Sequence, residues 1–131
     1  MDTKQHVLVV DDEVAVRTTL CVALEQAGYA VSSAADGVEG IEKAVREHPD
    51  LLLLDIVMPK LNGMELLARL RENEWGRTAK VIFFTHLEGD DDIIRGITAY
   101  EPSMYLMKGS WEIADVIAKV NEVLGVTNPQ Q

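Results

Sequence analysis

Five short apolar runs alternate with five segments of helical periodicity along this 131-residue chain. The runs predict strands, because an unbroken apolar run of this length suits a strand that is buried on both faces of a sheet. They lie at 6–10, 30–34, 51–54, 80–84 and 104–107. Helices are expected at 13–27, 37–47, 63–73, 89–99 and 111–124. Repeated strand–helix units with short connections predict an α/β fold, in which helices cover both faces of a parallel sheet.

Individual residues mark several of the expected helix boundaries. Gly28 should end the first helix, because glycine readily adopts the left-handed backbone found just beyond a helix. Asp36 and the glycine after it predict a turn before the second helix, and Asn62 with its following glycine introduces the third. Ser110 is expected to cap the last helix. Each helix should therefore begin within a few residues of the strand before it.

Polar side chains follow four of the five expected strands. They are Asp11 and Asp12 after the first strand, Asp55 after the third, Thr85 after the fourth and Lys108 after the fifth. Because the carboxyl ends of parallel strands face the same rim of a sheet, these side chains should converge. Three close carboxylates would repel one another, and Mg²⁺ would relieve that repulsion. A lysine can hold an anion and a threonine hydroxyl can donate to it. The set therefore indicates phosphoryl transfer with a carboxylate as nucleophile.

Each of these residues also has an ordinary structural explanation. Asp12 could cap the first helix, Thr85 could be a common strand-end residue, and Lys108 could lie solvated in a turn. Asp55 is the hardest to explain structurally, because four consecutive leucines lead straight into it. The functional interpretation depends on the combination at one rim and not on any single residue.

Composition narrows the possible classes of function. The formal net charge is −10, and such an acidic surface repels phosphate backbones, so we expect no direct nucleic-acid binding. No apolar run approaches the roughly 18 residues of a membrane span, and we expect no membrane association. The single cysteine, Cys21, suits a reducing cytoplasm. One domain is expected over residues 1–125, followed over 126–131 by a flexible tail or the start of a linker.

The strand-end residues and their neighbours resemble the response-regulator receiver domains of bacterial two-component signalling, the family of the chemotaxis regulator CheY. The matching stretches are Val9–Glu13, Asp55–Pro59 with Gly63 beyond it, Thr85, and Tyr105–Lys108. The resemblance runs from Val7 to about Leu124. It implies a doubly wound, flavodoxin-like sheet with strand order 2-1-3-4-5.

The resemblance also implies a role for each acid at the rim. Asp55 would accept a phosphoryl group from a sensor histidine kinase or a phosphotransfer protein. Asp12 and Asp55 would bind Mg²⁺ directly, Asp11 would bind it mainly through water, and the backbone carbonyl of Val57 would complete the protein ligands. The chain would catalyse its own phosphotransfer and slow autodephosphorylation, and would act as a switch and not as a turnover enzyme.

By the same resemblance, the remaining rim residues would read the phosphoryl group. Lys108 would pair with its oxygens and Thr85 would donate a hydrogen bond to them. Movement of Thr85 would make room for Tyr105 to rotate inward, although Tyr105 could also be an ordinary strand aromatic. The change would remodel the surface formed by the fourth helix, the fifth strand and the last helix. That surface would bind a downstream protein target or an output domain, or form a homodimer.

Four positions depart from the usual pattern of the family. Gly109 follows the lysine where the family usually has proline with a cis peptide, so we expect a trans bond here. His86 stands where a small residue usually follows the threonine; it could cover Asp55 or contact the phosphate, or simply face solvent. Val57 and Leu87 stand where fast-turnover members often carry polar residues that orient water. We therefore expect a long-lived aspartyl phosphate, shielded by His86.

Two other classes of protein use similar components. A phosphatase of the haloacid dehalogenase type carries a second acid two residues after its nucleophile, and that position is Val57 here. A flavin-binding flavodoxin-like module needs a phosphate loop rich in serine, threonine or glycine after the first strand. The acids at 11–13 have the wrong charge for such a loop. Uptake of one stable phosphate would distinguish the switch from both alternatives.

Overall fold

Five parallel strands form one sheet in the order β2-β1-β3-β4-β5, as the resemblance implied. The computed structural model describes residues 4–86 and 102–125. The strands are β1 (His6–Val10), β2 (Ala30–Ala34), β3 (Leu51–Leu54), β4 (Lys80–Thr85) and β5 (Met104–Met107). The described helices are α1 (Val14–Gln26), α2 (Gly37–Glu47), α3 (Gly63–Glu72), the 3₁₀ turn η1 (Trp75–Thr78) and α5 (Ile113–Leu124). The helix predicted at 89–99 and the tail predicted at 126–131 lie outside the described residues.

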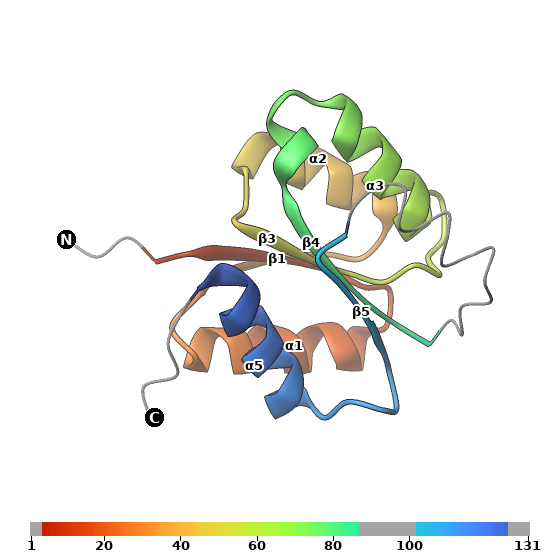
Figure 1. Ribbon diagram of the computed structural model, residues 1–131. Helices are drawn as coiled ribbons and strands as arrows, with labels where there is room; N and C mark the ends of the chain where they lie inside the picture. Colours follow the sequence, from red (N-terminus) through yellow and green to blue (C-terminus); the bar gives the residue numbers. More distant parts are fainter. Residues whose placement is uncertain (1–3, 87–101, 126–131) are drawn as a thin grey trace.

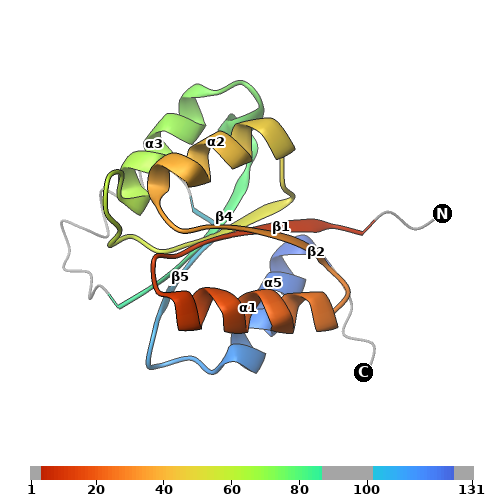
Figure 2. The ribbon, with the colours of Figure 1, turned by 180° about the vertical axis from the view of Figure 1, so that it is seen from behind.

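Helices cover both faces of the sheet, which explains why the central strands β1, β3 and β4 are almost entirely apolar. α2 and α3 lie on one face and α1 and α5 on the other, as Figures 1 and 2 show from opposite sides. Along β1, Leu8 and Val10 point into the core beneath α2 and α3, whereas Val7 and Val9 point into the core beneath α1 and α5. Alternate side chains of a strand face opposite ways, so two buried faces require an unbroken apolar run.

The register of the strands brings their carboxyl ends to one rim. Val10 lies beside Leu54, Leu54 beside Phe83, and Thr85 beside Met107. The residues that follow β1, β3, β4 and β5 in the sequence therefore meet at this rim. Among the described residues, no helix combines the length and apolar character that a membrane span requires.

Side chains at the helix termini bear out most of the predicted boundaries. Asn62 and Glu65 form a reciprocal capping box at the start of α3, with hydrogen bonds of 2.9 and 3.1 Å. The carboxylate of Asp36 accepts a hydrogen bond of 2.9 Å from the backbone N–H of Glu39 at the start of α2. Gly28 lies just beyond α1 with φ of 100°, a left-handed conformation that glycine adopts without strain.

Two features of the chain differ from the sequence-based expectations. Ser110 does not cap α5: the helix starts two residues later, Glu112 is its N-cap, and no side-chain hydrogen bond caps it. Gly109 and Ser110 form a turn, in which the Ser110 N–H donates to the Met107 carbonyl at 3.2 Å, and Trp111 forms a bridge with Lys108 before the helix begins. The short turn η1 was not predicted; its Trp75 ring stacks on His48 with centroids 4.5 Å apart. Such a contact between distant residues leaves no periodic signal in the sequence.

Candidate functional site

The buried polar side chains of the described chain all belong to the carboxyl rim of the sheet. They are Asp11, Asp55, Thr85 and Lys108, of which Asp55 is 4% and Lys108 7% exposed. The backbone carries each of them on the end of a strand. Asp55 donates its N–H to Val10 at 2.9 Å, and Lys108 donates its N–H to Thr85 at 2.8 Å. The hydrogen-bonded ladder therefore continues one residue beyond the strands and holds these side chains at defined positions.

Lys108 lies at the centre of this group. Its Nζ is 2.8 Å from Asp11 Oδ2, 3.2 Å from Asp55 Oδ2 and 3.2 Å from Glu13 Oε1. The other carboxylate oxygens accept backbone hydrogen bonds, since Asp55 Oδ1 accepts from Ile56 N–H at 2.8 Å and Asp11 Oδ1 accepts from Glu13 N–H at 2.9 Å. One ammonium group therefore neutralises part of the charge of three acids, and an excess of negative charge remains.

Burial and pairing act on the two strongest partners in different ways. Burial raises the pKa of Asp11, although hydrogen bonds from Lys108 and from the Glu13 backbone oppose that rise. For Lys108, burial favours a lower pKa, but its hydrogen bond to Asp11 and the charges of Asp11 and Asp55 outweigh it and raise the pKa. Lys108 is therefore held as a fixed cation beside Asp55.

The acids at the rim fit a hard divalent cation. Asp11, Asp12 and Asp55 each offer one carboxylate oxygen, and the three oxygens lie within 4.8 Å of one another. Asp12 is exposed while the other two are buried, so the cluster is open to solvent on one side. Mg²⁺ prefers a few carboxylate oxygens and keeps several waters. The three predicted carboxylates are thus present in an arrangement that can hold this ion.

A pocket of about 370 Å³ opens over the rim. It is lined by Asp12, Glu13, Asp55, Val57, Thr85 and His86. Five of these six residues were predicted to belong to the site, and Asp11 and Lys108 lie buried directly beneath them. The side chain of Val57 is 60% exposed at the pocket's edge. Leu87, the remaining predicted modulator, lies outside the described residues.

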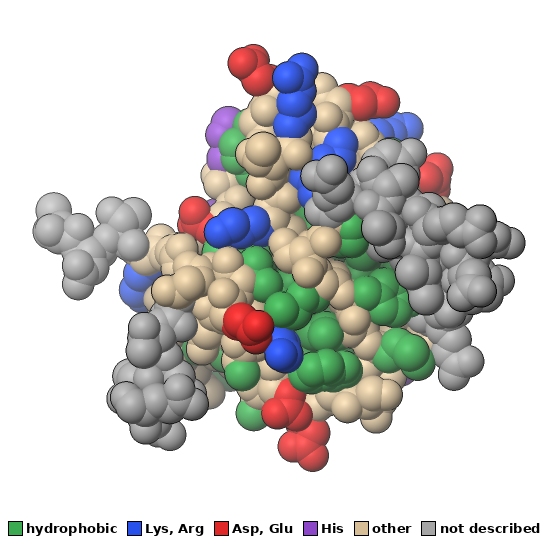
Figure 3. Space-filling model, in the orientation of Figure 1, with side chains coloured by type: hydrophobic (Ala, Val, Ile, Leu, Met, Phe, Trp, Pro, Cys, Tyr) green, Lys and Arg blue, Asp and Glu red, His purple; other side chains and the backbone are tan. Residues whose placement is uncertain are grey.

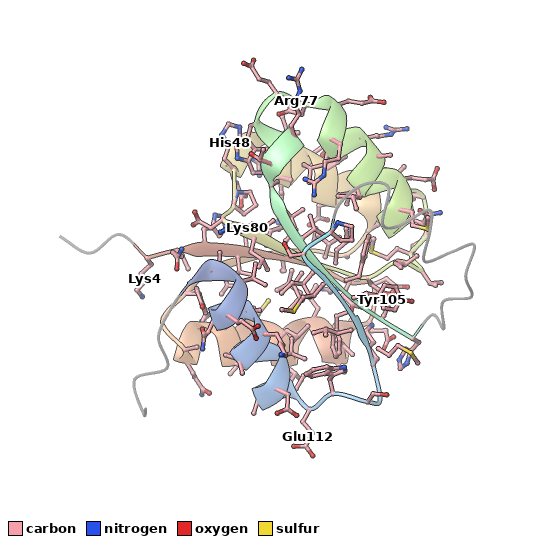
Figure 4. The ribbon with its side chains drawn as sticks, in the orientation of Figure 1. Lys4, His48, Arg77, Lys80, Tyr105 and Glu112 are labelled. Carbon is pink, nitrogen blue, oxygen red and sulfur yellow. The ribbon has the colours of Figure 1, made fainter. Side chains whose placement is uncertain are left out.

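Tyr105, the predicted switch aromatic, lies apart from the pocket on β5. Figure 4 shows it on the side of the molecule opposite Lys80 and His48. Its half-buried ring packs against Phe83 with centroids 6.3 Å apart. Burial, and secondarily the charge of Asp55, raise the pKa of the Tyr105 phenol. Tyr105 therefore lies near Asp55 without lining the pocket.

Sequence reasoning assigned no role to Glu13. It is the N-cap residue of α1, where its side chain caps no backbone group, so the alternative of an Asp12 cap is wrong as well. Instead Glu13 Oε1 contacts both Lys108 and His86, at 3.2 and 3.4 Å. A third consecutive acid after β1 was the only signal in the sequence that pointed to it.

Gly63 fits closely against the segment that begins at Asp55. Its N–H donates to the carbonyl of Ile56 at 2.8 Å, and a Cβ at this position would come within 2.2 Å of the Asp55 carbonyl oxygen. Only glycine allows α3 to begin so close to the end of β3. The glycine after Asn62 thus supports the position of Asp55. The peptide bonds of the described residues are all trans, Lys108–Gly109 included, as predicted.

Characterised relatives of the chain are regulators about twice its length. The DNA-binding dual master transcriptional regulator RpaA of Synechocystis is 34% identical over 123 residues, which cover 94% of this chain and 50% of RpaA. The response regulator MprA of Mycobacterium leprae is 34% identical over 124 residues, covering 95% of this chain and 53% of MprA. The chain therefore spans about half the length of these relatives.

Solved structures of similar shape are receiver domains. A CheY-like response regulator receiver domain from Methanospirillum hungatei matches with a TM-score of 0.86 at 28% identity, covering 94% of this chain and 95% of that one. The receiver domain of a sensor histidine kinase from Pseudomonas aeruginosa, with a magnesium ion coordinated in its active-site cleft, matches with a TM-score of 0.83 at 26% identity. That match covers 94% of this chain and 99% of the other. With a family model for the response regulator receiver domain matching residues 7–121, these similarities show that the chain belongs to that family.

Proposed function

We propose that this chain is the phosphorylation-activated switch of a two-component signalling system and that Asp55 accepts the phosphoryl group. One observation carries the proposal: the Asp55 carboxylate lies in the pocket, 3.2 Å from Lys108 Nζ and within 4.8 Å of oxygens of Asp11 and Asp12. A carboxylate nucleophile, a fixed cation and an acid cluster able to hold Mg²⁺ are the components that phosphoryl transfer requires. Membership of the receiver family supports the same assignment.

The phosphoryl donor is a phosphohistidine of a sensor histidine kinase or phosphotransfer protein. An oxygen of Asp55 attacks phosphorus in line with the leaving group, so that an O–P bond forms while the P–N bond breaks. The departing imidazole nitrogen keeps the electron pair and takes up a proton. Lys108 offsets the charge of the phosphoryl oxygens, and the Thr85 hydroxyl donates a hydrogen bond to one of them.

Four groups of this chain would hold the metal ion. Asp12, Asp55 and the backbone carbonyl of Val57 would bind Mg²⁺ directly, and Asp11 would bind it mainly through water. The bound ion would supply positive charge that offsets the acids and the phosphoryl group. The cluster of three carboxylate oxygens supports this assignment, as does the magnesium ion in the related Pseudomonas receiver domain.

Phosphorylation would change the surface of the protein through movements of Thr85 and Tyr105. Thr85 ends β4 beside β5, and its movement toward the phosphoryl group would leave room for the Tyr105 ring. The surface that would change includes β5 and α5 together with the helix expected at 89–99. Apolar side chains gather around β5 on the face seen in Figure 3, where a partner could bury them.

The partner of the switched surface is a downstream protein, an output domain or a second copy of the chain. Relatives such as RpaA are transcriptional regulators about twice as long, which supports an output domain. Contact with DNA would then belong to that domain and not to this chain, whose net charge is −10. We place the chain in the cytoplasm and propose that it turns over no substrate, apart from the slow loss of its own phosphoryl group.

The test compares wild type with Asp55→Asn after incubation with acetyl phosphate and Mg²⁺. Intact mass spectrometry should show one added phosphate on wild type and none on the variant, whose amide is nearly isosteric but is no nucleophile. Asp50→Asn is the matched control, because Asp50 lies at the other end of β3. EDTA should prevent the uptake by wild type. Equal uptake by Asp55→Asn would refute the assignment.

A further inference from the structure

One carboxylate oxygen joins three elements around the mouth of the pocket. Glu13 Oε1, at the start of α1, lies 3.2 Å from Nζ of Lys108 and 3.4 Å from Nε2 of His86. Lys108 follows β5 and His86 follows β4. The same oxygen therefore links the buried cation of the site to an imidazole at its rim. We call Glu13, His86 and Lys108 the latch.

We propose that Glu13 is a positioning residue that closes the pocket over Asp55. Its carboxylate holds His86 across the mouth and competes with an incoming phosphoryl group for Lys108. Transfer then requires Glu13 to release both partners. The inference rests on the proposed function of Asp55 and adds a barrier to entry of the phosphoryl donor.

The exposure of each side chain explains why Glu13 is the carboxylate that releases Lys108. The side chains of Glu13 and His86 are 43% and 66% exposed, whereas Asp55 beneath them is 4% exposed. Lys108 is surrounded by three carboxylates, so a phosphoryl oxygen must replace one of them. Asp11 is buried and also holds a backbone N–H, and Asp55 is the acceptor. Glu13 is the only one of the three that can turn into solvent without leaving a buried charge unpaired.

Charge and bulk both oppose a phosphodonor in the closed arrangement. A phosphodonor is an anion, and the exposed Glu13 carboxylate is an anion that it meets before it reaches the buried Asp55. The His86 ring occupies space along the same approach, because both residues line the pocket. Contacts between exposed groups of this kind are weak, so the latch slows entry and does not prevent it.

The test measures initial rates of phosphorylation by intact mass spectrometry with phosphoramidate, a small donor, and phosphoimidazole, a bulkier one. Glu13→Gln and His86→Ala should each accelerate uptake about two- to fivefold, the range that an exposed ion pair supports. His86→Ala should favour the bulkier donor, so the ratio of the two rates should change. A residue that only stabilised the fold would leave that ratio unchanged.

The double variant tests whether the two residues act together. If Glu13 holds His86 in place, Glu13→Gln/His86→Ala should be no faster than about the faster single variant, because either change releases the latch. Glu72→Gln, which removes an exposed acid from α3, is the charge-matched control and should leave both rates unchanged.

Three outcomes would overturn the latch while the function proposed for Asp55 still holds. They are unchanged or slower uptake by Glu13→Gln, an unchanged donor ratio in His86→Ala, and independent effects that multiply in the double variant. A wild-type protein that takes up no phosphate from either donor with Mg²⁺ would contradict the function of Asp55 itself and would remove the basis of the latch.

Discussion

At the carboxyl end of the sheet Lys108 is buried among three carboxylates, whereas at the amino end Lys80, the first residue of β4, is exposed and donates to the carbonyl of Val123 at 3.3 Å. Several other charged groups at the amino end also form hydrogen bonds with the backbone. Arg71 donates to the carbonyls of Gly76 and Ala79 at 2.7 Å each, and Asp50 accepts from the N–H of His6 at 2.7 Å. Charged groups at the carboxyl end face mainly one another.

This difference separates residues that stabilise the fold from residues that we propose take part in phosphoryl transfer. The free energy needed to remove charges from water exceeds what most ion pairs contribute. A buried cluster of like charges therefore destabilises the fold. Backbone carbonyls and N–H groups at strand ends, in contrast, need partners in any fold. The amino end meets that need, while the carboxyl end retains acids that repel one another.

Replacing each of the two lysines with alanine should reveal the largest difference in stability between the two ends of the sheet. Lys108→Ala leaves Asp11 and Asp55 buried without their cation and should lower the free energy of unfolding by about 3 kcal/mol. Lys80→Ala removes an exposed side chain and should cost less than about 0.5 kcal/mol. Urea unfolding followed by circular dichroism in EDTA measures both. Equal losses of unfolding free energy would show that the buried Lys108 contributes no more to stability than the exposed Lys80.

Gly63 and Gly76 are both closely packed, so substituting each of them compares the two ends of the sheet in a second way. A Cβ at Gly63 would come within 2.2 Å of the Asp55 carbonyl oxygen, and a Cβ at Gly76 within 2.0 Å of the Leu70 carbonyl oxygen. Alanine at either position should therefore destabilise the fold by about 1–3 kcal/mol.

The glycine variants should differ in phosphorylation. Only Gly63→Ala displaces the backbone of Asp55, so only this variant should also slow phosphate uptake under conditions in which both proteins remain folded. Acetyl phosphate with Mg²⁺ and intact mass spectrometry give the rate. Normal uptake by Gly63→Ala would mean that the start of α3 does not position the nucleophile.

The lifetime of the phosphorylated protein should depend on His86 and not on a histidine at the other end. His86 lines the pocket, and Val57 at its edge offers no side-chain group to orient water, so His86→Ala should accelerate decay of the phosphoprotein about two- to threefold. His48→Ala is the control, because His48 stacks on Trp75 far from the rim. Slower decay in His86→Ala would instead mean that the imidazole assists hydrolysis.

The smallest expected effect is a difference in the pH dependence of stability. Burial raises the pKa of Asp11 above 3.8. The stability that its protonated form contributes is fully present below 3.8 and is lost as pH rises through the folded-state pKa. At Glu47 burial favours a higher pKa, but the Ser32 hydroxyl and Arg46 lower it below 4.5. The stability from Glu47 is present above 4.5 and is lost as pH falls through the folded-state pKa.

Neutral variants of the two acids make these slopes measurable. Relative to Asp11→Asn, wild type should lose stability as pH rises through the acid range. Relative to Glu47→Gln, wild type should lose stability as pH falls through it. Urea unfolding in EDTA at several pH values gives the two differences. Slopes of the same sign for both acids would contradict the contrast between the ends of the sheet.

Most of the fold could be predicted because its central strands, β1, β3 and β4, are buried on both faces. Four of the five predicted strands have the observed bounds. The exception is β4, which extends one residue further than predicted, to Thr85. An unbroken apolar run bounded by polar residues leaves little choice of boundary. The start of α5 was predicted too early because a serine near a helix suggests a cap, whereas Ser110 lies in a turn and Trp111 forms a bridge with Lys108 before the helix begins.

The order of residues in the chain is enough to predict which side chains meet at the rim, since parallel strands place the residues that follow their carboxyl ends on one side of the sheet. Which of these side chains contact one another depends on the three-dimensional packing. Lys108 lies closest to Asp11, at 2.8 Å, and it reaches Glu13, a residue 95 positions away in the chain. Glu13 in turn reaches His86. Such contacts depend on where α1 begins relative to the ends of β4 and β5, and that placement follows from packing of the whole sheet and not from any local pattern of residues.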